Sequence, residues 1–188
     1  MKKLRRAWCG AVAKIDPAKL VFVDESGVNT AMTRTRGRGP KGQRVHGAVP
    51  HGDWKTVTML GAIRCDGMAA AATAPFSTDT DLFRAFVNQA LVPALRRGDV
   101  VVWDGLAPHK AAGLKQSVQS AGAELMPLPP YSPDLSPIEP CWSKVKEIVR
   151  AAEPRDEHAI GEATARAFAA VTGADARGWF KHCGYLVH

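Results

Sequence analysis

The amino-acid sequence predicts an α/β fold in which helices cover both faces of a mixed central sheet. Residues 20–23 (LVFV) are large, apolar and mostly β-branched or aromatic, as is typical of a buried strand. Residues 99–104 (DVVVWD) form a second apolar run, and its lack of alternation indicates burial on both faces. Between these runs, residues 77–97 change to a helical period. This order of strands and helices is the basis for the predicted fold class.

The first strand is followed by a basic loop and a β-hairpin. The strand is expected to end at the polar residues 26–27 (SG). Residues 33–44 come next, and their mixture of cations and glycines indicates a mobile loop rather than a packed element. Residues 55–63 and 68–74 then pair as two strands around a turn at residues 66–67 (DG).

The remaining elements alternate between helix and strand. In the helix over residues 77–97, Thr78 or Asp79 is the expected N-cap, and Pro93 should kink the last turn. After the strand at 99–104, the pattern predicts a helix over residues 109–121, a strand over 124–127, a helix that begins near Glu139, and a last helix over 157–171 that Gly173 ends.

Length and composition indicate one soluble globular domain with a polyanionic partner. The chain has 188 residues, and we expect a domain over residues 17–188 after a basic lead-in over residues 1–16. Lys and Arg outnumber Asp and Glu by 25 to 18, giving a net charge of +7. No apolar run approaches the roughly 20 residues of a membrane helix, so a cytoplasmic protein is expected. The cysteines and histidines are too scattered for a zinc site.

Each of the two apolar strands ends in an aspartate, Asp24 in the first and Asp104 in the second. Ligands of α/β proteins bind beside the C-terminal ends of strands. Because burying an unpaired charge is costly, such carboxylates need a partner. Taken singly, each aspartate has an alternative role as a turn-forming or helix-capping residue.

Glu139 stands at the mouth of a helix, after a stretch unusually rich in proline. The prolines are Pro127, Pro129, Pro130, Pro133 and Pro137. Because proline fixes φ and restricts the preceding residue, this stretch has few conformations and should aim Glu139 at one spot. Pro140 suits the first helical turn, and an apolar stripe that begins at Trp142 should dock the helix on the sheet. The alternative is a glutamate that is favoured only by the helix dipole.

Together, the three carboxylates suggest a site for hard cations. Mg²⁺ takes oxygen ligands, usually a few carboxylates together with water and substrate phosphate. Two such ions about 4 Å apart activate water and stabilise the leaving oxygen in phosphodiester cleavage. Asp24, Asp104 and Glu139 are therefore the candidate metal-binding and catalytic residues.

Three blocks of the sequence resemble the signature blocks of DDE transposases. They are FVDESG around Asp24, VVWDGLAPHK around Asp104 and LPPYSPDLSPIEPCWSKVK around Glu139. The interval of 34 residues between Asp104 and Glu139 is also characteristic of the mariner-related superfamily. Within it, the chain is most similar to the bacterial insertion sequence 630 family, and the resemblance covers about residues 17–188.

This resemblance implies a ribonuclease H-like fold, with Asp24 on the first strand, Asp104 on the fourth and Glu139 on a following helix. It implies that these carboxylates hold two Mg²⁺ ions, or Mn²⁺ in their place. The implied partner is DNA: water cuts the transposon end, and the freed 3′ hydroxyl attacks target DNA, often at TA. We also expect a homodimer on DNA, no membrane partner, and a place at the nucleoid.

The sequence departs from the family pattern in three respects. Gly105 stands where relatives commonly have asparagine, and this change would either loosen the turn that carries Asp104 or remove a polar contact near the metals. Trp103 replaces a smaller apolar residue. Only about sixteen residues precede the catalytic block, where relatives have helix-turn-helix modules that bind inverted repeats. We therefore expect an isolated catalytic domain: an excised fragment, one reading frame of a split gene, or a decayed copy.

Basic residues outside the three blocks are candidate DNA contacts. Cations among the glycines of residues 33–44 can follow a phosphate backbone without reading bases, although dimer contact or simple solvation are alternatives. His109 and Lys110 either approach the scissile phosphate or form only the polar first turn of a helix. Lys146 lies seven residues after Glu139, on nearly the same helix face. The candidate cations of the loop are Arg34, Arg36, Arg38, Lys41 and Arg44.

Three further residues have a structural and a functional interpretation. Glu25 is a turn residue or an accessory carboxylate. Trp54 is expected to pack in the core, with stacking on a flipped base as the alternative. Lys144 should leave its helix on a different face from Lys146.

Metal-dependent DNA strand transfer is the leading functional interpretation. One alternative is a nuclease on the same fold that only hydrolyses DNA. The other belongs to a different class, an inactive remnant that binds DNA or dimerises.

Overall fold

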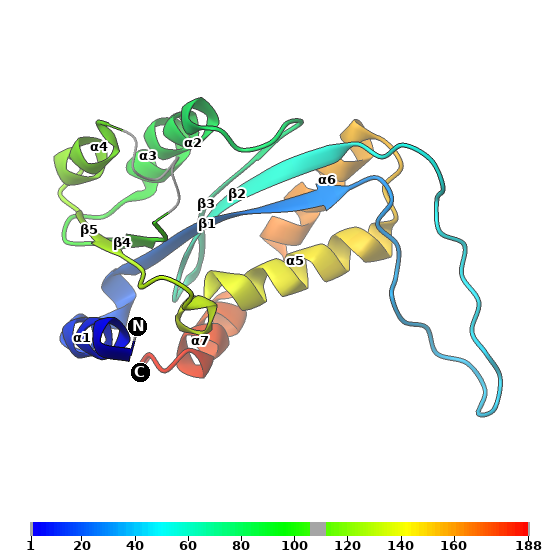
Figure 1. Cartoon of the computed structure of the whole chain (residues 1–188), viewed down its shortest axis with the longest axis horizontal. Helices are drawn as coiled ribbons and strands as arrows, with labels where there is room; N and C mark the ends of the chain where they lie inside the picture. Colours follow the sequence, from blue (N-terminus) through cyan, green and yellow to red (C-terminus); the bar gives the residue numbers. More distant parts are fainter. Residues whose placement is uncertain (1, 106–111, 188) are drawn as a thin grey trace.

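A computed structural model describes residues 2–105 and 112–187. A five-stranded sheet in the order β3-β2-β1-β4-β5 forms its centre (Figure 1). β2 pairs antiparallel with β1 and β3, whereas β4 pairs parallel with β1 and β5. The strands are β1 Leu20–Asn29, β2 Thr56–Arg64, β3 Gly67–Ala74, β4 Val100–Trp103 and β5 Glu124–Pro127. This arrangement confirms the predicted mixed sheet.

Helices cover both faces of the sheet, as predicted (Figure 1). Side chains of α2 and α4 share one core with the sheet, and those of α1, α5, α6 and α7 share the other. The helices are α1 Lys2–Val12, α2 Thr80–Phe86, α3 Val92–Ala94, α4 Leu114–Ser120, α5 Ile138–Ala152, α6 Glu157–Ala169 and α7 Gly173–His182. Within the part of the chain that is described, no helix is long and apolar enough to cross a bilayer.

β1 is buried on both faces because its side chains point alternately into the two cores. Leu20 and Phe22 belong to the core beneath α5, whereas Val21 and Val23 belong to the core beneath α2 and α4. Asp24 lies two residues after Phe22, so the strand period places it on the face that α5 covers.

The prediction that the first strand ends at residues 26–27 is wrong. β1 continues to Asn29, and every residue from Phe22 to Asn29 has a partner on β2. Ser26 pairs with Met59 and Gly27 with Thr58. Because β2 satisfies the backbone hydrogen bonds along this whole stretch, pairing overrides the local preference of Ser-Gly for a turn.

A long arm leaves the sheet between β1 and β2. Figure 1 shows residues 31–55 running far from the body of the molecule and returning to it. These residues form no helix or strand, and residues 34–49 are all exposed. The arm confirms that the basic stretch at residues 33–44 is a loop and not a packed element.

Several helix boundaries differ from the predictions. Asp79 is the N-cap of α2 and accepts a hydrogen bond from the Leu82 amide, 2.8 Å away. A π-helical stretch over Val87–Leu91 then precedes α3, which contains Pro93. The helix predicted over residues 109–121 is confirmed only from Leu114 onward. Gly113 has a φ of 89°, outside the helical region, so a continuous helix cannot run through it.

Two helices, α1 and α7, were not predicted from the sequence. Trp8 and Val12 of α1 are buried in the core beneath α5. In the sequence, the basic residues around them obscured the apolar face of this helix. The prediction that Gly173 ends the preceding helix is wrong, because α6 ends at Ala169 and Gly173 opens α7. Thr172 caps α7 in a capping box with Asp175, and this S/T-x-x-acid signal was overlooked.

Candidate active site

Asp24, Asp104 and Glu139 line one cavity of about 540 Å³. Asp24 lies on β1, Asp104 directly follows β4, and Glu139 lies in the first turn of α5. Phe22 pairs with Val102 on the neighbouring parallel strand, so the two aspartates, each two residues further on, lie level with one another. Three carboxylates from distant parts of the sequence therefore share one cavity.

The proline-rich stretch forms one wall of this cavity. A 3₁₀ turn over Pro133–Leu135 leads into α5, and the Glu139 amide donates to the Ser136 carbonyl, 3.1 Å away. The stiff approach to Glu139 is therefore also a surface of the site. The wall residues that line the cavity are Leu128, Pro129, Pro130, Tyr131, Ser132, Pro133 and Ser136.

The carboxylate of Asp24 is held in a desolvated position. Trp142 Nε1 donates a hydrogen bond to Asp24 Oδ2 over 3.0 Å. The pKa of Asp24 is raised to about 7, mainly by burial and with a smaller contribution from the negative charges of Glu25 and Glu139. The hydrogen bonds from Trp142 and the Glu25 backbone oppose this rise. Asp24 is therefore a carboxylate that a nearby cation would strongly favour in its charged form.

Trp142 reaches Asp24 because residue 61 has no side chain. Gly61 pairs with Asp24 across β1 and β2. A Cβ at Gly61 would lie only 2.7 Å from the Cη2 atom of Trp142, so any other residue would displace the indole ring. From the sequence, Trp142 was expected only to pack against the sheet. The signal that could have revealed its second role is a glycine inside a strand, which marks close approach of another group.

The donor set fits hard divalent cations, but the three carboxylates do not meet at one point. Asp24, Asp104 and Glu139 offer only oxygen ligands, and the repulsion between Glu139 and Asp24 favours a positive charge between them. Among residues 2–105 and 112–187, no three Asp, Glu, His or Cys side chains are arranged to hold a single ion. The arrangement is suited to ions that are shared between pairs of carboxylates and completed by water or phosphate oxygens.

The residues next to Asp24 and Asp104 in the sequence have different surroundings. Gly105 is exposed and lines the cavity directly after Asp104. Trp103 is buried in the opposite core, where its ring meets Phe83 edge-on at 5.5 Å, so packing accommodates it. Glu25 is half-buried on β1 and not in a turn.

Of the predicted DNA-contacting cations within the described residues, none lines the cavity. All five loop cations are exposed on the arm, away from the sheet (Figure 1). They are Arg34, Arg36, Arg38, Lys41 and Arg44. Lys146 is half-buried on α5 and is not among the residues that line the cavity. His109 and Lys110 lie outside the described residues.

Trp54 and Lys144 are near these cations in the sequence. The prediction that Trp54 packs in the core is wrong, because Trp54 lies at the base of the arm with 60% of its surface exposed. Lys144 does leave α5 on a different side from the cavity, where its ammonium contacts Asp175 at 2.6 Å and the Ala170 carbonyl at 2.9 Å. Lys144 therefore joins α5 to α7.

A family model described as DDE superfamily endonuclease matches residues 19–160. The matched region includes all three carboxylates of the cavity. No similarity to a curated protein was found.

Solved structures of Mos1 transposase have the same fold. A paired-end complex with the left transposon end has a TM-score of 0.72 and 16% identity, over 94% of this chain and 55% of that chain. The catalytic domain of Mos1 mariner transposase has a TM-score of 0.62 and 14% identity, over 94% and 82%. The same domain with raltegravir and Mg has a TM-score of 0.62 and 14% identity, over 94% and 86%.

These likenesses confirm the ribonuclease H-like fold that the sequence resemblance implied. The chain spans about half the length of the Mos1 chain in the paired-end complex.

Proposed function

Because the chain belongs to the DDE superfamily endonuclease family, we propose that it is the catalytic domain of a transposase that cuts DNA at a transposon end and joins the freed strand to target DNA. The observation that carries this proposal is the single cavity lined by Asp24, Asp104 and Glu139. The block around Glu139 supports the bacterial insertion sequence 630 family as the branch, and this resemblance implies TA as a frequent target dinucleotide.

We propose that Asp24, Asp104 and Glu139 hold two Mg²⁺ ions, with Mn²⁺ as a substitute. The oxygen-only donor set and the desolvation of Asp24 support this choice. When bound, the ions supply Lewis acidity at the scissile phosphate and lower the pKa of the attacking water or 3′ hydroxyl.

The chain's own residues would orient the reactants. Trp142 fixes the Asp24 carboxylate from the side of α5. The proline-rich wall fixes the approach to Glu139, which spares entropy that a flexible carrier would lose on binding. No side chain forms a covalent bond to DNA in this scheme, because the attacking groups are water and a DNA hydroxyl.

The arm is the best-placed surface for a DNA backbone or a second protomer. Its five cations are exposed and stand in a stretch that contains several glycines, so they can follow phosphates without fixed geometry. His109, Lys110 and Lys146 remain proposed contacts closer to the scissile phosphate. A homodimer on DNA, at the nucleoid, is the proposed working state.

A supercoiled plasmid assay with Mg²⁺ tests the proposal. We expect nicking and strand joining by the wild type, and loss of both in Asp24→Ala, Asp104→Ala and Glu139→Ala, while DNA binding persists. Full Mg²⁺-dependent activity in any of these variants would remove that residue from the site. Arg166→Ala is a matched control, because Arg166 lies on α6 in an exposed i,i+4 pair with Glu162.

The same assay separates the other functions. Nicking without joining would indicate a nuclease that only hydrolyses DNA. DNA binding without either reaction would indicate an inactive remnant. In each case we expect weak binding that falls steeply with salt, since the arm offers phosphate contacts only. Salt-insensitive, sequence-specific binding would contradict that expectation.

A further inference from the structure

Tyr131 is an exposed aromatic residue on the wall of the catalytic cavity. It lines that cavity, yet 91% of its surface is exposed. Its φ is 53°, in the left-handed region that residues other than glycine rarely adopt. Neither feature stabilises the fold, because the ring gains little from burial and the backbone is strained. Strained residues of this kind persist where the surrounding structure holds them, often at functional sites.

A chain of hydrogen bonds holds the backbone around Tyr131. Ser132 Oγ donates to the Pro130 carbonyl over 3.2 Å, which closes a tight turn with Tyr131 at its apex. Arg5 Nη1 of α1 donates to Ser132 Oγ over 2.8 Å. The same guanidinium contacts both carboxylate oxygens of Asp134, at 2.9 and 2.5 Å. Ser132 itself is only 2% exposed, so the exposed Tyr131 is followed directly by a buried residue that fixes the turn.

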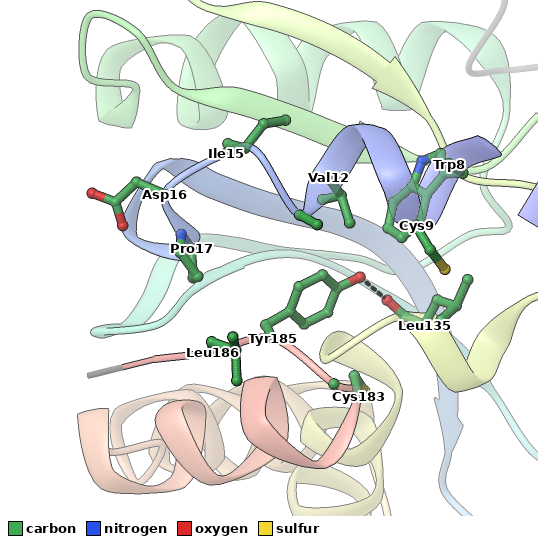
Figure 2. A pocket seen from close by; sticks show the side chains of 12 residues that line it. Trp8, Cys9, Val12, Ile15, Asp16, Pro17, Leu135, Cys183, Tyr185 and Leu186 are labelled. Atoms are coloured by element: carbon green, nitrogen blue, oxygen red, sulfur yellow. Dashed lines mark hydrogen bonds between the residues drawn. The ribbon is translucent and has the colours of Figure 1, made fainter. Parts of the chain in front are cut away.

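The 3₁₀ turn that follows Tyr131 is also held by Tyr185, near the C-terminus. Figure 2 shows the Tyr185 hydroxyl pointing to the Leu135 carbonyl. Both residues line a second cavity of about 460 Å³, which residues of α1 and of the C-terminal segment also line. That hydroxyl donates over 2.6 Å. The Tyr185 ring packs against Phe22 of β1 at 5.3 Å and Phe180 of α7 at 5.6 Å. The wall is thus tied to the core strand that carries Asp24.

We propose that Tyr131 stacks on an unpaired DNA base beside the phosphate that enters the catalytic cavity. This inference rests on the proposed function. An exposed aromatic ring binds bases by stacking without reading their sequence, because every base has a π-face. Bases inside a duplex hide their faces in the stack, so the ring offers a surface to an unpaired or terminal base. The locked backbone means that little freedom is lost when the base arrives.

Fluorescence of 2-aminopurine tests this contact. The probe is a forked DNA with 2-aminopurine at its single-stranded junction, bound in the presence of Ca²⁺, an oxygen-ligated cation that we use in place of Mg²⁺. Wild-type protein should quench the fluorescence, and Tyr131→Phe should quench it equally because the ring is retained. Tyr131→Ala should abolish the quenching and weaken binding to the fork by roughly 5- to 150-fold, the effect expected for one stacked base.

Two controls separate stacking from structure. Tyr131→Asn suits the left-handed backbone better than tyrosine but lacks the ring, so it should behave like Tyr131→Ala in binding with an unchanged or higher Tm. Phe76→Ala removes an aromatic side chain that is 54% exposed and lies outside the cavity, and should leave quenching intact. Normal quenching by Tyr131→Ala, or equal losses with Phe76→Ala, would overturn the stacking role.

The proposed function and the stacking role fail in different ways. If the wild type cleaves DNA in Mg²⁺ but quenching does not depend on Tyr131, the stacking role falls and the function stands. If quenching depends on Tyr131 but no cleavage occurs in Mg²⁺ or Mn²⁺, the proposed function falls and the stacking role stands. If the wild type binds no forked DNA, both fall.

Discussion

Two aspartates at opposite ends of the stretch where the neighbouring strands β1 and β4 pair lie in opposite electrostatic settings. Asp99, just before β4, is fully buried, and its Oδ2 atom accepts hydrogen bonds from the Arg64 guanidinium at 2.5 Å and the Arg96 amide at 2.8 Å. Asp24 of β1 lines the cavity at the other end of this paired stretch, where the charges that raise its pKa are the carboxylates of Glu25 and Glu139.

This contrast separates a structural carboxylate from one that is suited to bind a cation. The fold brings Arg64 from β2 to pair with Asp99 Oδ2, so the negative charge at that end is balanced within the chain, although Asp99 Oδ1 and Arg64 Nε are buried without a hydrogen-bond partner among the described residues. Around Asp24 the fold gathers further negative charge in a cavity open to ligands. The charged form of a carboxylate that is buried near other carboxylates is stabilised only when a cation binds. The charged form of a carboxylate paired with an arginine of the same chain is stabilised without any ligand.

The strongest test of the contrast is to remove the internal cation. Arg64→Ala leaves Asp99 buried without its partner, and we expect the free energy of unfolding to fall by about 3–5 kcal/mol, measured by urea denaturation. Arg96→Ala is the matched control, because the Arg96 side chain is 60% exposed and pairs with the exposed Asp66; it should cost less than about 1 kcal/mol. Equal losses in both variants would mean that the buried pair is not special.

Removing the charge of Asp24 should raise the free energy of unfolding, whereas removing Arg64 lowers it. The pKa of Asp24, about 7 in the fold, exceeds the ordinary value of about 4, so the folded state binds more protons between these pH values. Wild-type stability therefore falls as pH rises from about 4 to about 7. Metal-free Asp24→Asn avoids this loss and should be more stable than wild type by on the order of 2–4 kcal/mol at pH 8, but by much less at pH 4. Urea melts at both pH values check it, and a destabilised variant at pH 8 would contradict the assignment.

Adding a cation should stabilise the Asp24 end alone. With saturating Mn²⁺ at pH 8, we expect wild-type stability to rise by about 1–3 kcal/mol, and by less at pH 6 because protons compete for Asp24. Asp24→Asn should show little of this gain. Arg96→Ala, at the far end of the sheet, should keep it. Thermal melts with and without Mn²⁺ measure the effect, and an equal shift in Asp24→Asn would place the ion elsewhere.

The smallest effect is expected at a third carboxylate, which is paired on the surface. The hydrogen bond from Lys144, helped by Thr172, lowers the pKa of Asp175 to about 2. Its contribution is therefore present above about pH 4 and is lost as pH falls toward 2. Lys144→Ala should cost roughly 0.5–1 kcal/mol at pH 7, because both side chains are partly exposed. DNA binding should not change, and a large loss of affinity would show that Lys144 contacts DNA.

The sequence predicted the parts of the fold that local pattern determines. The apolar run at residues 100–103 and the prolines before Glu139 each permit few structures, and both lie where they were expected. Asp24 and Asp104 lie side by side because each stands two residues after a member of the Phe22–Val102 pair on neighbouring strands. These features depend on short stretches of chain, so a single sequence carries enough information.

What the sequence could not give depends on contacts between distant residues. β1 runs through Ser26 and Gly27 because β2 pairs with it, and no local signal reports that partner. Arg64 and Asp99 are 35 positions apart, so their pairing is visible only in three dimensions. The hydrogen bond from Trp142 to Asp24 likewise spans 118 positions and depends on the space left at Gly61.

That missing side chain at position 61 has a consequence for descendants of this sequence. Any substitution there must either evict the indole ring of Trp142 or be matched by a simultaneous change on α5. Position 61, remote in sequence from every acidic residue of the cavity, therefore decides how the Asp24 carboxylate is held, although it contributes no side chain to the site.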